Sequence, residues 1–161
     1  MRVLGIDPGY DRLGIAVLER SDSGGEKLIH SECLTTESSL PLQERLVALG
    51  TEFIKLLETH APDCVAMEML FFNKNQKTAM AVAETRGMLI YLARTHNKQV
   101  FEYTPPQVKV AVTGYGKSDK KQVADMVQRL LPDMRDGALD DEYDAVAVGI
   151  TCLASERSLS T

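Results

Sequence analysis

The chain has 161 residues, 44% of them hydrophobic and 25% charged, which suits one globular domain that buries about 70% of its unfolded surface without disulfide or metal cross-links. The three cysteines form no CxxC pair, no hydrophobic run approaches the ~20 residues of a membrane span, and patterned sequence begins at Met1, so we expect a protein of the reducing cytoplasm with no membrane association and no signal peptide. The net charge of −5 argues against a passive nucleic-acid coat, which would carry a basic excess.

The first 35 residues predict three antiparallel strands. Residues 2–7 form a short apolar run, and Asp-Pro-Gly at 7–9 marks a turn. Residues 13–19 resume the apolar pattern, so the two runs predict a hairpin. The turn-forming segment 21–26 then leads to a third strand near 27–35.

The middle of the chain alternates between helical and strand patterns. Leucine and phenylalanine recur at helical spacing over 42–58, and a proline-containing turn ends that helix. A short apolar strand at 64–67 runs straight into Glu68. Residues 77–95 contain no proline and predict a long helix, which a strand over 99–103 follows.

The C-terminal third predicts two further helices. Pro105-Pro106 is expected to break regular structure, a helix covers 119–131, and the small apolar residues of 145–154 predict a final helix packed closely on a sheet. The order of elements predicts a single α/β domain, with helices on the faces of a mixed sheet. We place this domain at residues 1–157, followed by a short flexible tail at 158–161.

Charge is unevenly distributed along the chain. Residues 71–94 and 105–121 each contain four basic side chains against one acidic side chain. Residues 132–144 contain six acidic side chains against Arg135 alone. The negative charge is therefore concentrated in one segment, and the two basic segments are candidates for contact with nucleic acid.

Three acidic features stand where strands or helices end. Asp7 closes the first strand, Glu68 closes the fourth, and the cluster at 140–144 opens the last helix. Each has an ordinary alternative: a turn starter, an exposed strand-end charge, or a helix N-cap at Asp140 or Asp141. The combination is less ordinary, because an apolar strand delivers an acid into a turn twice and an Asp-x-x-Asp pair follows, spaced one helical turn apart.

Carboxylates that converge in this way would need a divalent cation, since like charges otherwise raise their pKa values. Hard carboxylate oxygens with no His or Cys partner favour magnesium or manganese over zinc. Two such ions would offset four negative charges and let DNA approach. They can also activate a water and stabilise the leaving 3′ oxygen of a phosphodiester, which is hydrolysis without a protein nucleophile.

Seven short motifs occur in an informative order along nearly the whole chain. They are GIDPG at 5–9, Glu68 before FFNKN at 71–75, TRG at 85–87, FEY at 101–103, QVK at 107–109, GxG at 114–116 and DxxDA at 141–145. In this order and spacing they resemble the RuvC-type Holliday-junction resolvases of the ribonuclease-H-like superfamily. The resemblance implies one ribonuclease-H-like domain whose five-stranded sheet combines three antiparallel and two parallel strands.

The resemblance also implies an activity and a site. Asp7, Glu68, Asp141 and Asp144 look like the catalytic, metal-binding tetrad, with two Mg²⁺ ions per site and Mn²⁺ able to substitute. The expected enzyme is a homodimer that makes paired symmetric nicks in four-way junction DNA during recombination and repair, leaving 5′-phosphate and 3′-hydroxyl ends. A branch-migration motor complex of the RuvA and RuvB type is the expected partner.

Aromatic and basic side chains are the candidates for DNA contact. Phe71 and Phe72 follow Glu68 in a loop rich in Asn and Lys, and the resemblance favours Phe71 as a ring that stacks on a base, a contact worth about 1–3 kcal/mol. The alternative is a ring anchored in the core. The candidate phosphate contacts are Lys74, Lys109, Lys120 and Lys121, whose alternative is ordinary solvated surface.

The segment 111–118 nearly matches the phosphate-loop motif GxxxxGK[ST], but Ala111 replaces its first glycine. An ATPase is therefore disfavoured, whereas backbone amides together with Lys117 could still bind a DNA phosphate. The three histidines have neither ligand spacing nor an adjacent nucleophile, so a hydrolase triad has no support.

Three other functions compete with a junction resolvase. One is a related ribonuclease-H-like nuclease that acts on RNA or another branched substrate. A second is an actin-like phosphotransfer protein, which would need two such domains. A third is a non-catalytic junction-binding module, disfavoured because all four acids are present.

Two details remain open between alternatives. The small apolar stripe of Met80, Ala83, Gly87 and Ile90 predicts a dimer interface on the helix over 77–94, or burial against its own sheet. At about 100° per residue, Asp140 lies some 40° from Asp144 and Asp141 some 60° away on the other side, while Glu142 lies roughly 160° away. We expect Asp141 to be the ligand and Asp140 to be the N-cap.

Overall fold

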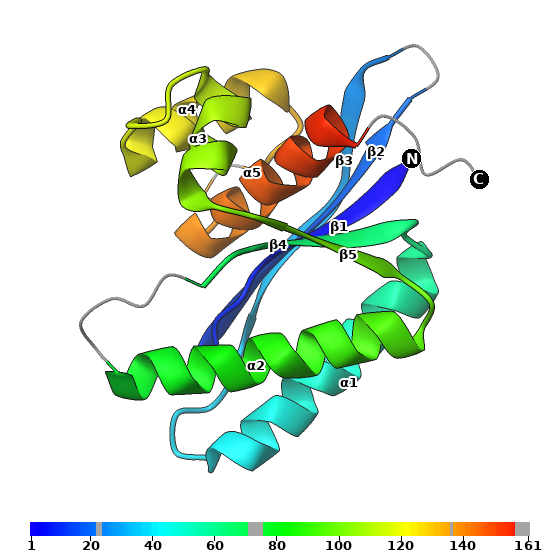
Figure 1. Ribbon diagram of the computed structural model, residues 1–161, viewed down its shortest axis with the longest axis vertical. Helices are drawn as coiled ribbons and strands as arrows, with labels where there is room; N and C mark the ends of the chain where they lie inside the picture. Colours follow the sequence, from blue (N-terminus) through cyan, green and yellow to red (C-terminus); the bar gives the residue numbers. More distant parts are fainter. Residues whose placement is uncertain (22–23, 71–75, 136, 157–161) are drawn as a thin grey trace.

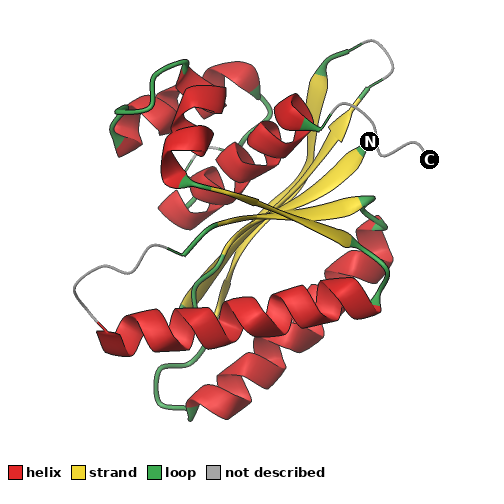
Figure 2. Ribbon diagram, viewed as in Figure 1, coloured by secondary structure: helices red, strands yellow, loops and turns green. Residues whose placement is uncertain are grey.

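The computed structural model describes residues 1–21, 24–70, 76–135 and 137–156, which form five strands and five helices. Figure 1 shows their course and Figure 2 their type. The strands are β1 Arg2–Asp7, β2 Arg12–Arg20, β3 Glu26–Thr35, β4 Cys64–Glu68 and β5 Gln99–Tyr103. The helices are α1 Leu42–His60, α2 Gln76–Thr95, α3 Pro105–Thr113, α4 Lys120–Leu130 and α5 Asp140–Ser155. None of these described helices is long and apolar enough to cross a membrane.

The five strands form one mixed sheet in the order β3-β2-β1-β4-β5. β1, β2 and β3 pair antiparallel, whereas β4 runs parallel to β1 and β5 runs parallel to β4. This confirms the predicted single α/β domain with three antiparallel and two parallel strands. The register pairs Ile6 of β1 with Met67 of β4, so the next residues, Asp7 and Glu68, leave adjacent strands at the same edge of the sheet.

Helices cover both faces of the sheet (Figure 1), with α1 and α2 on one face and α3, α4 and α5 on the other. Each face has its own apolar core. Leu4 and Ile6 of β1 join the core under α1 and α2, while Val3 joins the core under α5. Burial of both faces explains why the central strands read as continuous apolar runs.

Helix α5 lies unusually close to the centre of the sheet because glycine removes side chains from the contact. A Cβ atom on Gly5 of β1 would stand 2.4 Å from the Ala145 carbonyl oxygen, and one on Gly14 of β2 would stand 1.9 Å from the Asp141 carbonyl oxygen. A side chain at either position would push α5 outward. The two glycines therefore set the depth at which the first turns of α5 meet the carboxyl end of β1.

One helix of the structure contradicts the sequence prediction. Pro105-Pro106 begins α3 instead of breaking regular structure. Proline is tolerated in the first turn of a helix, where its missing N–H would have no intrahelical partner. The Thr104 side chain caps the helix and Gln107 completes a capping box, so the segment TPPQ is a helix start.

The last helix begins in the acidic cluster 140–144, as expected, but one residue earlier than an N-cap at Asp140 would place it. Its first residue is Asp140 and its N-cap is Leu139, whose side chain makes no capping hydrogen bond. The prediction that Asp140 is the N-cap was therefore wrong. The cause lies in Glu142, which accepts a hydrogen bond from the Leu139 backbone N–H at 3.2 Å and starts the helix without a polar cap.

Candidate active site

Four carboxylates meet where β1 and β4 end and α5 begins. Asp7 is partly buried at the end of β1, Glu68 at the end of β4, and Asp141 and Asp144 in the first turns of α5. The pKa of Asp7 is raised to about 7, first by burial and then by the negative charges of Asp144, Glu68 and Asp141. The structure thus brings together the four acids that the sequence singled out.

Two lysines oppose this accumulation of negative charge. Burial and the charge of Asp144 raise the pKa of Glu68, against the opposing effect of Lys109 and Lys120. Burial also raises the pKa of Asp144, although Lys120 Nζ lies 3.0 Å from Asp144 Oδ2. The site is acidic at its centre and basic at its rim, which is the charge pattern expected where a phosphodiester meets metal-binding carboxylates.

A cleft of about 250 Å³ opens beside the carboxylates and is lined by Glu68, Asp144, Lys109 and Lys120. A second hollow of about 230 Å³ contains Asp7 and shares Glu68 with the first. Helix α3, which the sequence reading missed, forms the wall that carries Lys109. Asp7, Glu68 and Asp144 therefore face solvent-accessible space instead of a closed core.

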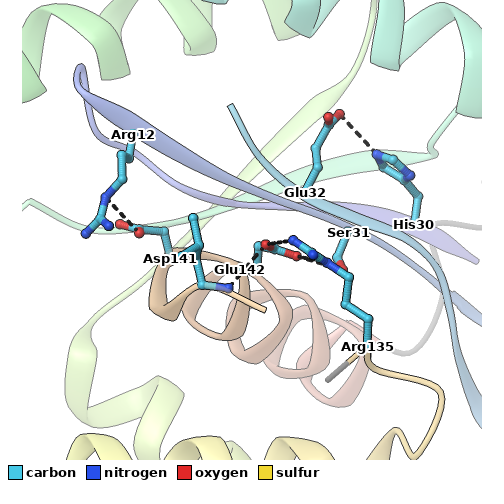
Figure 3. Close-up of polar contacts among 8 residues, drawn as sticks. Arg12, His30, Ser31, Glu32, Arg135, Asp141 and Glu142 are labelled. Atoms are coloured by element: carbon cyan, nitrogen blue, oxygen red, sulfur yellow. Dashed lines mark hydrogen bonds and ion pairs between the residues drawn. The ribbon is translucent and has the colours of Figure 1, made fainter. Parts of the chain in front are cut away.

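Cationic side chains hold two of the four acids in this structure. Lys120 contacts Asp144 and also lies 3.5 Å from Asp140. Arg12 Nε lies 3.1 Å from Asp141 Oδ2, and Figure 3 shows this pair of side chains pointing toward each other. As these side chains stand, no three His, Cys, Asp or Glu residues of the described ranges surround one point closely enough to hold a metal ion. A bound ion would have to replace Lys120 or Arg12 as the counter-charge.

The residues nevertheless fit a hard divalent cation. Their donors are carboxylate oxygens, which suit Mg²⁺ and Mn²⁺. Asp141 Oδ2 is buried and accepts no hydrogen bond, even though the Arg12 guanidinium is within ion-pair distance. A buried carboxylate oxygen without a hydrogen-bond donor gains free energy from a cation.

Asp140 and Asp141 differ sharply in placement. The Asp140 side chain is 74% exposed and the Asp141 side chain is 18% exposed. Asp141 contributes to the raised pKa of Asp7, whereas Asp140 is not among the causes of that shift. Geometry therefore favours Asp141 as the partner of Asp7, although both residues belong to the helix.

The other predicted contact residues are spread around the site. Lys117 is exposed in the loop before α4, and Lys121 is exposed on α4 itself. Ser118 is buried and its hydroxyl donates to the Tyr115 carbonyl, while Asp119 caps the Gln122 amide, so any anion there would depend mainly on Lys117. The remaining predicted contacts lie outside the described residues: Phe71, Phe72 and Lys74.

Sequence reasoning missed three arginines that hold the site. Arg12 pairs with Asp141. Arg86 of α2 donates from Nε to the Glu68 carbonyl oxygen at 3.3 Å and forms an ion pair with Glu102. Arg45 of α1 is buried and donates to the Tyr10 carbonyl oxygen, which anchors the turn after Asp7. The motif TRG contains Arg86, but nothing in the spacing reveals what Arg12 or Arg45 touches.

Comparison with known sequences identifies relatives along the whole chain. Residues 3–152 match the family described as crossover junction endodeoxyribonuclease RuvC. The chain is 44% identical over 156 residues to the protein of that name from Thermosipho melanesiensis, covering 97% of this chain and 98% of the relative. It is 42% identical over 159 residues to that of Caldicellulosiruptor saccharolyticus, covering 99% and 96%.

Comparison with solved structures identifies the same family. The structure of Thermus thermophilus RuvC matches with a TM-score of 0.89 at 31% identity, covering 98% of this chain and 96% of that chain. Thermus thermophilus RuvC in complex with Holliday junction substrate matches with a TM-score of 0.87 at 31% identity, covering 94% and 92%. The chain belongs to the RuvC family of crossover junction endodeoxyribonucleases.

Proposed function

We propose that this protein is a divalent-metal-dependent endodeoxyribonuclease that resolves Holliday junctions by paired symmetric nicks in recombination and repair. Family membership supports the reaction and the substrate class. The observation that carries the proposal is the convergence of four carboxylates where β1 and β4 end and α5 begins, with Glu68 and Asp144 lining a cleft beside Lys109 and Lys120. A cluster of this kind, open to solvent and flanked by lysines, suits phosphodiester chemistry.

We assign the metal ligands to Asp7, Glu68, Asp141 and Asp144. Bound there, two Mg²⁺ ions, or Mn²⁺ in their place, would activate the attacking water and stabilise charge on the leaving 3′ oxygen. No nucleophilic side chain is required, and the products carry 5′-phosphate and 3′-hydroxyl ends. The sheet edge supplies two of the ligands and α5 the other two, so the cluster depends on how α5 is seated.

The lysines of the rim are proposed to bind the DNA backbone. Lys109 and Lys120 line the same cleft as Glu68 and Asp144, where a phosphate would be held beside the carboxylates. Lys120 now pairs with Asp144, and it would be free to contact phosphate if a divalent cation held by Asp144 took over as the counter-charge. The outer contacts, proposed from the family resemblance, are Phe71, Phe72, Lys74, Lys117 and Lys121.

Paired nicks imply two active sites, so we propose a homodimer with α2 in its interface. Leu89 and Ala93 of α2 are fully buried in the core, whereas Met80 on the proposed stripe is 65% exposed. Gly87 is also exposed. Ile90 of the stripe is partly buried and packs against the core, so the part of the stripe that a partner could cover is the exposed part around Met80 and Gly87. We further propose that the dimer works in the cytoplasm with a branch-migration motor complex of the RuvA and RuvB type.

The substrate preference is tested by measuring cleavage in Mg²⁺ of three nucleic acids of equal length. They are a mobile four-way DNA junction, a linear DNA duplex and an RNA–DNA hybrid. We expect symmetric, religatable nicks in the junction and little cleavage of the other two. Preferred cleavage of the hybrid would instead support a ribonuclease. Tight junction binding without any cleavage would support a binding module.

A further inference from the structure

Glu142 is a buried acidic side chain of the segment 132–144, and the proposed chemistry does not use it. It is fully buried, with 0% exposure, although it lies between the proposed ligands Asp141 and Asp144. A buried carboxylate is rare unless it is paired and hydrogen-bonded. Its surroundings therefore show what it contributes.

Both oxygens of Glu142 are saturated by donors. Oε1 receives a hydrogen bond from Arg135 Nη2 and another from the Leu139 backbone N–H at 3.2 Å. Oε2 accepts one hydrogen bond from Arg135 Nε at 3.3 Å and another from the Ser31 hydroxyl at 3.2 Å. Arg135 thus grips the carboxylate with two nitrogens, a geometry that fixes orientation as well as charge.

These contacts tie together three parts of the chain. Ser31 belongs to β3, Arg135 and Leu139 to the connection before α5, and Glu142 to the first turn of α5 (Figure 3). Leu139 is the N-cap and offers no capping side chain. Glu142 therefore supplies the reciprocal half of a capping box and determines where the helix begins.

The first turn that Glu142 anchors carries the catalytic carboxylates on its other side. Successive helical residues are about 100° apart, so Glu142 points about 100° from Asp141 and about 160° from Asp144. Figure 3 shows Asp141 directed to Arg12 while Glu142 is directed to Arg135 and Ser31. Glu142 therefore acts on the site only through the rotation and depth of the helix.

We propose that Glu142, held by Arg135 and Ser31, is a positioning residue that sets Asp141 and Asp144 at the geometry needed to bind divalent metal. The inference rests on the proposed metal site. Residues that orient metal ligands commonly affect metal affinity or activity by about 10–100-fold when changed. A purely structural ion pair would lower the melting temperature and leave metal affinity unchanged.

The test compares Glu142→Gln with Glu19→Gln. Both changes neutralise a carboxylate paired with an arginine, but Glu19 contacts Arg2, at the opposite end of β1 from Asp7. Thermal unfolding of each protein in rising MgCl₂, without DNA, gives the Mg²⁺ dissociation constant, which is the midpoint of Mg²⁺ binding, because stabilisation grows as RT ln(1 + [Mg²⁺]/Kd). Junction cleavage in the same Mg²⁺ series gives a second midpoint, and junction affinity is measured in Ca²⁺.

We expect Glu142→Gln to raise both Mg²⁺ midpoints about 10–100-fold, with junction affinity in Ca²⁺ within about twofold of the parent. Glu19→Gln should leave both midpoints unchanged. Arg135→Lys keeps the charge but loses the two-nitrogen grip, so it should shift the midpoints in the same direction by less. Because Arg135 is 58% exposed, this variant carries the test if Glu142→Gln does not fold.

Unchanged Mg²⁺ midpoints in these variants, with or without a lower melting temperature, would overturn the positioning role. The midpoint of Mg²⁺ binding is measured by thermal unfolding without DNA, so it tests the role of Glu142 even if the parent protein cuts another substrate. A parent protein that binds Mg²⁺ but does not cleave junctions would count against the proposed function alone. A parent protein that Mg²⁺ does not stabilise would overturn both.

Discussion

Asp7 and Glu142 are two acidic side chains of one domain whose surroundings are opposite. Glu142 is fully buried and receives donors from an arginine, a serine and a backbone amide. Asp7 stands among three other carboxylates, and its pKa is raised to about 7. Hydrogen-bond donors therefore surround Glu142, whereas burial and like charges disfavour the ionised form of Asp7. Burial alone therefore does not separate a structural acid from a functional one, but the charges around it do.

The largest expected effect is the loss of junction cleavage when a proposed metal ligand is changed. We expect Asp7→Asn and Glu68→Gln to reduce junction cleavage by several orders of magnitude, because each removes a proposed metal ligand. Junction binding should stay intact or become stronger, since each change also removes a negative charge that faces DNA. Single-turnover cleavage and equilibrium binding of one labelled junction measure both. Parallel loss of binding and cleavage would point to misfolding instead.

Changes at the neighbouring residues Asp140 and Asp141 test whether the loss of cleavage is specific to the proposed ligand. Asp141→Asn should cost orders of magnitude in rate, because this side chain is mostly buried and lies toward Asp7. Asp140→Asn should leave cleavage within about tenfold, since Asp140 is exposed and pairs with the rim lysine Lys120. The reverse order of rates would transfer the ligand role to Asp140.

Stability should change in opposite directions at the two acids. In chelator, Asp7→Asn should raise the melting temperature at pH 8 by about 5 °C, at roughly 2–4 °C per kcal/mol for a chain of this size, whereas Glu142→Gln should lower it. The folded pKa of Asp7 is about 7 against an ordinary value of 3.8 for this side chain. Ionisation therefore opposes folding increasingly as pH rises between these values.

The advantage of Asp7→Asn should accordingly shrink as the pH falls from 7 toward 4, because the native aspartate becomes protonated there. Melting curves of both proteins across this pH range check the sign. A variant that is less stable than the parent at pH 8 would mean that Asp7 is held by favourable contacts. The surroundings of Asp7 would then stabilise its carboxylate, as hydrogen-bond donors do for Glu142.

The rim lysines should give the smallest change. Lys109→Ala and Lys120→Ala should each weaken junction binding modestly and reduce its salt dependence by about one unit of slope. Lys55→Ala provides a comparison, since Lys55 is exposed on α1, on the other face of the sheet, and does not line the cleft. A slope that is unchanged in Lys109→Ala and Lys120→Ala would mean that neither side chain touches phosphate.

Much of this arrangement was predictable from sequence, because local patterns determine it. Apolar runs that end in Asp7 and Glu68 predicted the strands, and the parallel register of β1 and β4 then brings those two acids together. The double proline before Gln107 was misread because a turn signal and a helix start share the same residues. The capping box formed by Thr104 and Gln107 decides between them.

Contacts between distant segments were not predictable. Glu142 was excluded as a ligand by its helical angle, and the structure agrees that it faces away from the cleft. Its role depends on Ser31, 111 residues earlier in the chain, and no spacing rule reveals such a pair. Arg45 and Tyr10 likewise meet only after the sheet and α1 have packed.

The central claim is that the carboxylates around Asp7 form a metal-dependent cutting site. Its most direct test is cleavage of a mobile four-way junction in Mg²⁺, in Ca²⁺ and in chelator, with binding measured in parallel. We predict symmetric nicks in Mg²⁺, binding without cleavage in Ca²⁺, whose looser coordination places the attacking water poorly, and no cleavage in chelator. Equal cleavage rates in Ca²⁺ and Mg²⁺, or cleavage in chelator, would contradict the account.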